Sequence, residues 1–298
     1  MPSITPPLDT GVPQLLVDHT SGTGEGPLWH EEGRYLTWID IPAGQLFRYT
    51  PDAGTHELIY QHTGQIGGYT IQRDGALIVF ADNGAIFRLI GDMPDPIFPE
   101  IEELRGTRFN DVIADPEGRI FAGTMPLGDG SARLYRLDPN GELTLLYDDL
   151  TLSNGMGFSP DLATFYLTDS NSHRIYAIEY DRATGNLGKR TTLITTAENE
   201  IVPDGMAVDR DGAIWSAQYG GGGILKYTPE GKMIGKVELP VRNVTSITFG
   251  GPHFATAFVT SAGGAQRGEQ NGFLAGSLFR LNPKTHGTAP FRSRIGMT

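Results

Sequence analysis

Cysteine is absent from the 298-residue sequence, and several chemistries are excluded with it. Without thiols the chain forms no disulfide, binds no metal through thiolates and has no cysteine nucleophile. Basic residues are also scarce: 23 Lys and Arg residues stand against 35 Asp and Glu residues and leave a formal net charge of −12. This acidic balance argues against nucleic acids and anionic membranes as partners.

Long apolar runs and familiar catalytic motifs are missing too. No stretch approaches the roughly 18 consecutive apolar residues of a membrane-spanning helix, and residues 1–14 lack the basic and apolar regions of a secretory signal. The seven histidines show no paired metal-binding spacing, and neither a nucleophile elbow nor a phosphate-binding loop occurs. We expect a cytoplasmic protein that acts on a small molecule, as a monomer or a weak homo-oligomer.

Glycine and proline, by contrast, are abundant. The chain has 40 Gly and 20 Pro residues, spread evenly, which is typical of many short strands joined by tight turns. A repeat organises these strands: each copy has an anchor residue, a short apolar strand, a turn with glycine or proline, and a second apolar strand. The six anchors follow one another at intervals of 41–50 residues, and they are Glu25, Gly67, Asn110, Asn154, Asp204 and Thr245.

The repeat predicts an all-β fold, a six-bladed β-propeller with four-stranded antiparallel blades. Two further alternating strands complete each copy, and four strands in about 40–50 residues form one propeller blade. Six blades use the whole chain, so we predict one propeller domain over residues 1–298, with residues 1–12 as a flexible N-terminal segment. The sixth repeat lacks a strong fourth strand, which either residues 13–18 or residues 290–295 could supply.

The anchors are expected to form a ring, because the first strand of each blade lines the central channel of a propeller. Four of the six anchors carry carboxylate or amide oxygens: Glu25, Asn110, Asn154 and Asp204. Such a donor set fits one divalent cation, such as Ca²⁺, Mg²⁺ or Mn²⁺, with Zn²⁺ and Fe²⁺ also open. Alternatively, these residues cap strand ends or begin turns. Their recurrence at four matching positions favours the metal site.

Two features beside the ring each allow two interpretations. Arg108 lies two residues before Asn110 and so should project from the same face at the channel mouth, where it could bind a substrate oxygen or pair with a carboxylate. Gly155 and Gly205 each follow an anchor. They permit either a close backbone approach or a simple tight bend.

Five short motifs occur in order, within a match that runs from about residue 22 to 290: Gly24-Glu-Gly-Pro-Leu-Trp29, Arg108-Phe-Asn-Asp111, Ala122-Gly-Thr-Met125, Ser153-Asn-Gly-Met156 and Pro203-Asp-Gly-Met206. Each motif is short, but their order and their coincidence with the ring make the combination specific. Together they resemble the family that unites gluconolactonase, regucalcin (senescence marker protein) and luciferin-regenerating enzyme.

The resemblance implies roles for the ring residues. Glu25, Asn154 and Asp204 would hold one divalent cation completed by water, Arg108 and Asn110 would contact substrate, and Asp204 would also act as general base. The implied activity is the metal-dependent hydrolysis of a sugar lactone, such as gluconolactone or a pentonolactone, to the aldonic acid.

One loop departs from the family pattern. Family members can carry an acidic residue after the Ala-Gly-Thr-Met motif that helps to bind sugar hydroxyls, whereas this chain has the short loop 126–130. Asp129 in that loop is the candidate substitute. Two rival functions remain open: a metal-dependent esterase or organophosphate hydrolase, and a non-catalytic calcium-binding propeller.

Overall fold

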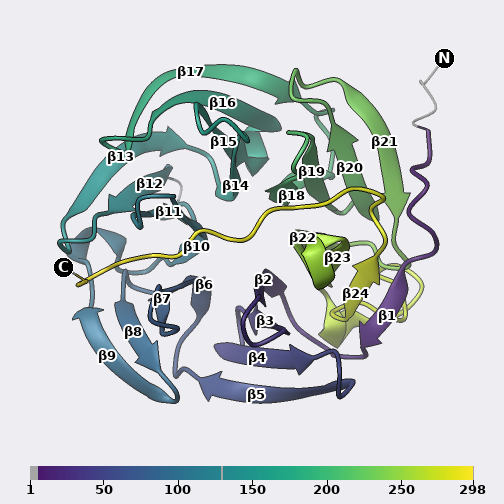
Figure 1. Ribbon diagram of the computed structural model, residues 1–298, viewed down its shortest axis with the longest axis horizontal. Helices are drawn as coiled ribbons and strands as arrows, with labels where there is room; N and C mark the ends of the chain where they lie inside the picture. The colour runs from purple at the N-terminus through teal and green to yellow at the C-terminus, as the bar shows by residue number, and fades with distance from the viewer. Residues whose placement is uncertain (1–5, 129, 298) are drawn as a thin grey trace.

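The computed structural model describes residues 6–128 and 130–297. Six four-stranded antiparallel sheets are arranged around a central channel (Figure 1), which confirms the predicted six-bladed β-propeller. None of the described helices is long and apolar enough to span a membrane.

Each of the first five blades is built from four consecutive strands, with the first strand innermost. Blades one and two contain β2 (Gly24–His30), β3 (Tyr35–Asp40), β4 (Gln45–Thr50), β5 (Thr55–Gln61), β6 (Ile66–Ile71), β7 (Leu77–Ala81), β8 (Ile86–Ile90) and β9 (Met93–Phe98). Blades three and four contain β10 (Phe109–Ala114), β11 (Ile120–Thr124), β12 (Ala132–Leu137), β13 (Leu143–Leu150), β14 (Ser153–Phe158), β15 (Thr164–Asp169), β16 (Arg174–Asp181) and β17 (Asn186–Thr195). Blade five contains β18 (Val202–Val208), β19 (Ile214–Tyr219), β20 (Gly223–Tyr227) and β21 (Met233–Glu238).

The sixth blade joins the two ends of the chain. Its inner strands are β22 (Val244–Gly250), β23 (Thr256–Ser261) and β24 (Leu278–Leu281), and its outer strand is β1 (Gln14–Val17), which pairs with β24. Of the two segments that could have completed this blade, the N-terminal one is therefore confirmed. Helical structure in the described chain is limited to four 3₁₀ turns: η1 (Glu102–Leu104), η2 (Ser170–Ser172), η3 (Pro252–Phe254) and η4 (Gly264–Gln266).

The C-terminal segment has a different course. Residues 284–297, which we call the C-terminal strap, cross one face of the propeller from the sixth blade toward the third (Figure 1). The strap is fixed at its far end by Gln72, whose side-chain oxygen accepts hydrogen bonds from Ser293 Oγ and the Ile295 amide. At the other end of the polypeptide, part of the segment expected to be flexible contacts β21, because Leu8 and Lys236 form a backbone hydrogen bond.

Apolar side chains pack between the blades. The six clusters of buried apolar residues fall one at each junction between neighbouring blades. Trp29, Trp38 and Trp215 belong to these clusters and are at most 5 % exposed. Each blade is therefore stabilised mainly by its neighbours, through the burial of apolar surface.

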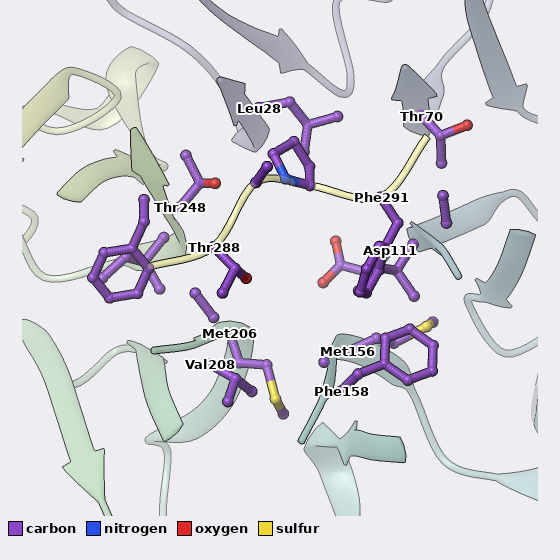
Figure 2. Close-up of a pocket in the computed structure, with 18 of the residues that line it drawn as sticks. Leu28, Thr70, Asp111, Met156, Phe158, Met206, Val208, Thr248, Thr288 and Phe291 are labelled. Carbon is purple, nitrogen blue, oxygen red and sulfur yellow. The ribbon is translucent and has the colours of Figure 1, made fainter. Parts of the chain in front are cut away.

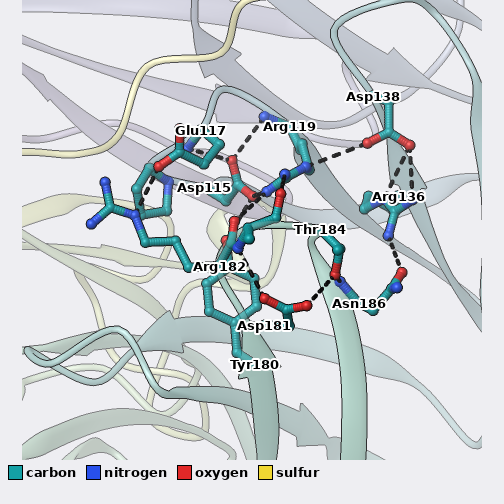
Figure 3. A network of polar contacts seen from close by, with 12 residues as sticks. Asp115, Glu117, Arg119, Arg136, Asp138, Tyr180, Asp181, Arg182, Thr184 and Asn186 are labelled. Carbon is teal, nitrogen blue, oxygen red and sulfur yellow. Dashed lines mark hydrogen bonds and ion pairs between the residues drawn. The ribbon is translucent and has the colours of Figure 1, made fainter.

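A polar network reinforces the junction of blades three and four (Figure 3). The buried carboxylate of Asp115 accepts hydrogen bonds from the Arg119 guanidinium at 2.8 Å and from Tyr180 Oη at 2.7 Å. Arg119 also donates to the carbonyls of Arg182 and Ala183 in the next blade. Asp115 thus has the structural role expected of a turn residue.

Candidate functional site

The ring predicted from the repeat coincides with an irregularity in every inner strand. In β10, Phe109 pairs with Thr124 and Val112 with Ala122, so that Asn110 and Asp111 together lie opposite one residue. Equivalent register shifts occur in β2, β6, β14, β18 and β22 at or directly after their anchor residues. Such bulges re-aim side chains, and here they bend each strand where it reaches the axis.

The four polar ring residues are all buried. Glu25, Asn110, Asn154 and Asp204 are between 4 and 7 % exposed, although each carries a charged or strongly polar group. Asn110 Nδ2 donates to Asn154 Oδ1 at 3.1 Å, so at least two of the ring side chains are in direct contact. Burial of this kind requires hydrogen bonds or a bound ion to compensate the lost hydration.

Hydrogen bonds fix the two amides of the ring. Asn110 Nδ2 also donates to the Ser153 carbonyl at 2.9 Å, and Asn154 Nδ2 donates to Ser170 Oγ at 3.0 Å. Ser170, which the sequence did not single out, donates in turn to the Pro203 carbonyl at 2.6 Å. These contacts determine which end of each amide is the oxygen, and they hold the Asn154 oxygen on the ring side.

The carboxylates of the ring repel one another in a site with little water. Burial raises the pKa of Glu25 well above its usual range, and the carboxylates of Asp111 and Asp204 raise it further. Burial likewise raises the pKa of Asp204, with Asp111 adding to the effect and Arg108 opposing it. The site is therefore short of positive charge.

Arg108 lies next to Asn110, as the sequence suggested. Its Nη1 donates to Asn110 Oδ1 at 2.6 Å and to the Phe109 carbonyl at 2.9 Å. Burial lowers the pKa of Arg108, while the neighbouring carboxylates act in the opposite direction. The guanidinium forms no ion pair within the described chain, so the structural interpretation as an ion-pair partner is not favoured.

Sequence reasoning missed Asp111. Burial raises the pKa of this carboxyl to about 6, and Arg108 opposes the shift. The motif Arg108-Phe-Asn-Asp111 contained the residue, but strict alternation would direct it away from the face of Asn110. The bulge makes both consecutive side chains part of the axial region, and a repeat pattern gives no sign of it.

Two ring positions carry no polar ligand group toward the axis. Gly67 comes so close to blade three that a Cβ atom there would lie 1.9 Å from the Phe109 carbonyl oxygen. Thr245 Oγ1 donates to the Gly24 carbonyl at 2.5 Å and lies 2.9 Å from Thr260 Oγ1. Gly155 shows the same crowding as Gly67, since its Cβ would lie 2.6 Å from the Asp204 carbonyl oxygen. Of the two interpretations of that glycine, close approach is the one observed.

The chemistry of the ring fits a divalent cation. No group of three or more His, Asp or Glu side chains in the described chain is placed to hold a metal by itself. An ion on the axis would therefore combine the carboxylates of Glu25 and Asp204 with the amide oxygen of Asn154, which is a normal mixture for a hard cation. The buried carboxylates of Glu25 and Asp204 and the half-buried one of Asp111 lie near one guanidinium, and they leave an excess of negative charge that such an ion would neutralise. Asp129, the sixth predicted site residue, lies outside the described residues.

Comparison with known proteins shows to which family this chain is related. The model of the SMP-30/gluconolactonase/LRE-like region matches residues 23–263. The chain belongs to this family. Pentonolactonase XacC of Haloferax volcanii is 41 % identical over 287 residues, which cover 94 % of this chain and 97 % of that protein. Human regucalcin is 32 % identical, over 90 % of this chain and 93 % of its own length.

Solved structures of the SMP-30/gluconolactonase/LRE-like type share the fold. A luciferin-regenerating enzyme superposes with a TM-score of 0.86 at 24 % identity, and the match covers 95 % of this chain and 99 % of that one. The calcium-binding protein regucalcin from Agrobacterium tumefaciens has a TM-score of 0.87 at 24 % identity, over 97 % of this chain and 99 % of its own. The family assignment agrees with the resemblance drawn from the five motifs.

Proposed function

We propose that this protein is a lactonase that hydrolyses a sugar lactone to the aldonic acid with the help of one divalent cation on the propeller axis. The supporting observation is the buried ring of carboxylates and amides, in a chain 41 % identical to a pentonolactonase. Glu25, Asn154 and Asp204 are the proposed ligands. A cation held there would act as a Lewis acid toward the lactone carbonyl and lower the pKa of a water molecule.

The remaining steps belong to side chains of this chain. Arg108 and Asn110 would orient the lactone through its carbonyl and hydroxyl oxygens, since both lie beside the ring with polar atoms near the axis. Asp204 would accept a proton from the attacking water as the new C–O bond forms. As the ring C–O bond breaks, the protonated Asp204 would return this proton to the departing alkoxide, so that one water is consumed for each aldonic acid formed.

Substrate class and metal dependence can be tested together. The metal-depleted protein and the protein reconstituted with Ca²⁺, Mg²⁺, Mn²⁺ or Zn²⁺ are assayed with pentonolactones, gluconolactone, paraoxon and an aryl ester. We expect lactone hydrolysis with at least one metal and little with the depleted protein. The Asp204→Ala variant should lose this activity by about 1,000-fold or more while its circular dichroism is unchanged.

Other outcomes of the same assay contradict the proposal. Preferential turnover of paraoxon or the aryl ester would indicate a different hydrolase. Metal binding without turnover of any substrate would indicate a binding protein. Full activity of Asp204→Ala would contradict the assignment of the general base.

A further inference from the structure

A cavity of about 390 Å³ lies on the propeller axis, beyond the ring and under the C-terminal strap (Figure 2). All six inner strands contribute to its wall, together with strap residues 288–291. Most of its lining is apolar, and it includes Leu28, Met156, Phe158, Met206, Val208 and Phe291.

One charged group faces this apolar space without a partner. Asp111 points its carboxylate into the opening (Figure 2) and takes part in no hydrogen bond or ion pair with a described residue. Asp209 also borders the cavity, but its carboxylate is satisfied by Trp215 Nε1 at 3.0 Å and Lys226 Nζ at 3.1 Å. Asp111 is therefore the polar group around which a ligand would be organised.

The residues that line the cavity indicate which class of ligand it could bind. An anion would be repelled by Asp111 and by the nearby carboxylates of Glu25 and Asp204. A bare metal ion needs about six oxygen ligands, which a wall of Met, Phe, Val and Leu side chains does not supply. A sugar would place the hydroxyls that face the Met, Phe, Val and Leu side chains without hydrogen bonds, and burying them unpaired is costly.

We propose that this cavity binds a small molecule with an apolar body of about two fused rings and a single ammonium head, with the head held by Asp111. A primary ammonium has three donors. The Thr288 side chain lies across the opening from the Asp111 carboxylate (Figure 2), and Thr248 borders the same cavity. The size follows from volume, since a cavity of about 150 Å³ accommodates benzene and this one is about 390 Å³. The proposal is independent of the hydrolytic reaction at the ring.

The strap provides a route of entry. It is anchored on one side by the hydrogen bond between the Gly287 amide and the Phe254 carbonyl, and on the other by that between the Ser293 amide and the Ile71 carbonyl. Between these points, residues 288–292 form no backbone hydrogen bond with any described residue. Side-chain contacts hold this stretch, chiefly the packing of Phe291 against Phe158, and a segment without backbone hydrogen bonds opens at lower free energy than the strands beneath it.

Tryptamine is the probe, because it combines a two-ring apolar body with a primary ammonium. Its binding is measured by titration calorimetry on protein saturated with Mg²⁺, beside 3-methylindole, which lacks the ammonium, and methylamine, which lacks the body. We expect tryptamine to bind at least ten-fold more tightly than either control. Asp111→Asn should weaken tryptamine at least ten-fold and leave 3-methylindole unchanged.

Three further variants locate the site. Asp211→Asn removes an exposed carboxylate that does not line the cavity and should leave binding unchanged. Val208→Phe fills part of the cavity and should weaken tryptamine even if Asp111→Asn does not fold. Asp204→Asn should weaken tryptamine much less than Asp111→Asn, because Asp204 attracts the ammonium only from a distance and the ring is not the proposed site.

Several results would overturn the proposal. They are the absence of tryptamine binding, equal binding of 3-methylindole or methylamine, and unchanged tryptamine binding in both Asp111→Asn and Val208→Phe. Loss of binding in Asp204→Asn alone would place the amine at the ring instead.

Discussion

Four blades place a polar ring residue on the axis and two do not, yet all six inner strands share the same kind of register shift there. In blade two the position is Gly67, which has no room for a side chain against blade three. In blade six it is Thr245, whose hydroxyl is bonded to the Gly24 carbonyl of blade one. The backbone geometry thus belongs to the propeller, and the chemistry depends on which side chain occupies each position.

Within this comparison, the largest expected effect distinguishes a ring residue that is a proposed ligand from one that is not. Asn154→Ala removes an amide oxygen and the contacts with Asn110 and Ser170. We expect kcat/KM for the lactone to fall by about 100-fold or more. Thr245→Val, the matched change in a blade without a ligand, should alter it by less than about three-fold. Equal losses in steady-state assays would mean that the two kinds of blade do not differ in function.

Gly67→Ala tests whether blade two is excluded from the site by crowding. The added Cβ would lie 1.9 Å from the Phe109 carbonyl oxygen, so the two inner strands must move apart. We expect a loss of about 3 kcal/mol in the free energy of unfolding, measured with urea. Gly54→Ala is the control, because its φ is +65° but nothing lies within 4 Å of the new Cβ. It should cost about 1 kcal/mol, and a similar cost for both would exclude crowding.

Strand β2 carries polar residues of two kinds. Glu25 lies on the ring, and His30 is buried at the other end of the strand. Burial lowers the pKa of His30 to about 3, with Arg292 and Arg48 adding to the effect. The unfolded chain therefore takes up a proton below about pH 6.5 that the folded chain refuses. The contribution of the neutral His30 to the free energy of unfolding should be complete above about pH 6.5. It should fall by about 1.4 kcal/mol per pH unit as the pH drops toward 4.

Urea unfolding at pH 7 and pH 5 measures this slope. His30→Gln should flatten it, and the exposed His286→Gln should not. A slope that is the same in His30→Gln as in the unchanged protein would show that other groups cause the acid sensitivity.

The smallest effect concerns the threonine of blade six. Thr245→Val keeps the shape but leaves the Gly24 carbonyl and Thr260 without their partner. We expect a loss of about 1 kcal/mol in the free energy of unfolding, which Thr245→Ser should largely restore. No measurable loss would mean that the hydroxyl does not help to join blade six to blade one.

The sequence predicted the parts of this molecule that repeat. The spacing of the anchors was sufficient to predict the number of blades and a ring containing Glu25, Asn154 and Asp204, because equivalent positions in a propeller converge by symmetry. It was not sufficient for Asp111, whose placement depends on a bulge, or for the cavity that Asp111 faces. Residues 290–295 were the rival candidate for the fourth strand of blade six, and only their course across the axis identifies them as part of the strap.

The pairing of β1 with β24 has a consequence for synthesis. β1 is the first strand of the propeller to be synthesised, and its partner β24 is the last. Until β24 is made, β1 has no partner within the propeller, and the blades form an open arc. Unpaired strand edges invite pairing with other chains, so nascent copies on one messenger RNA risk exchanging their first strands until each arc closes on itself.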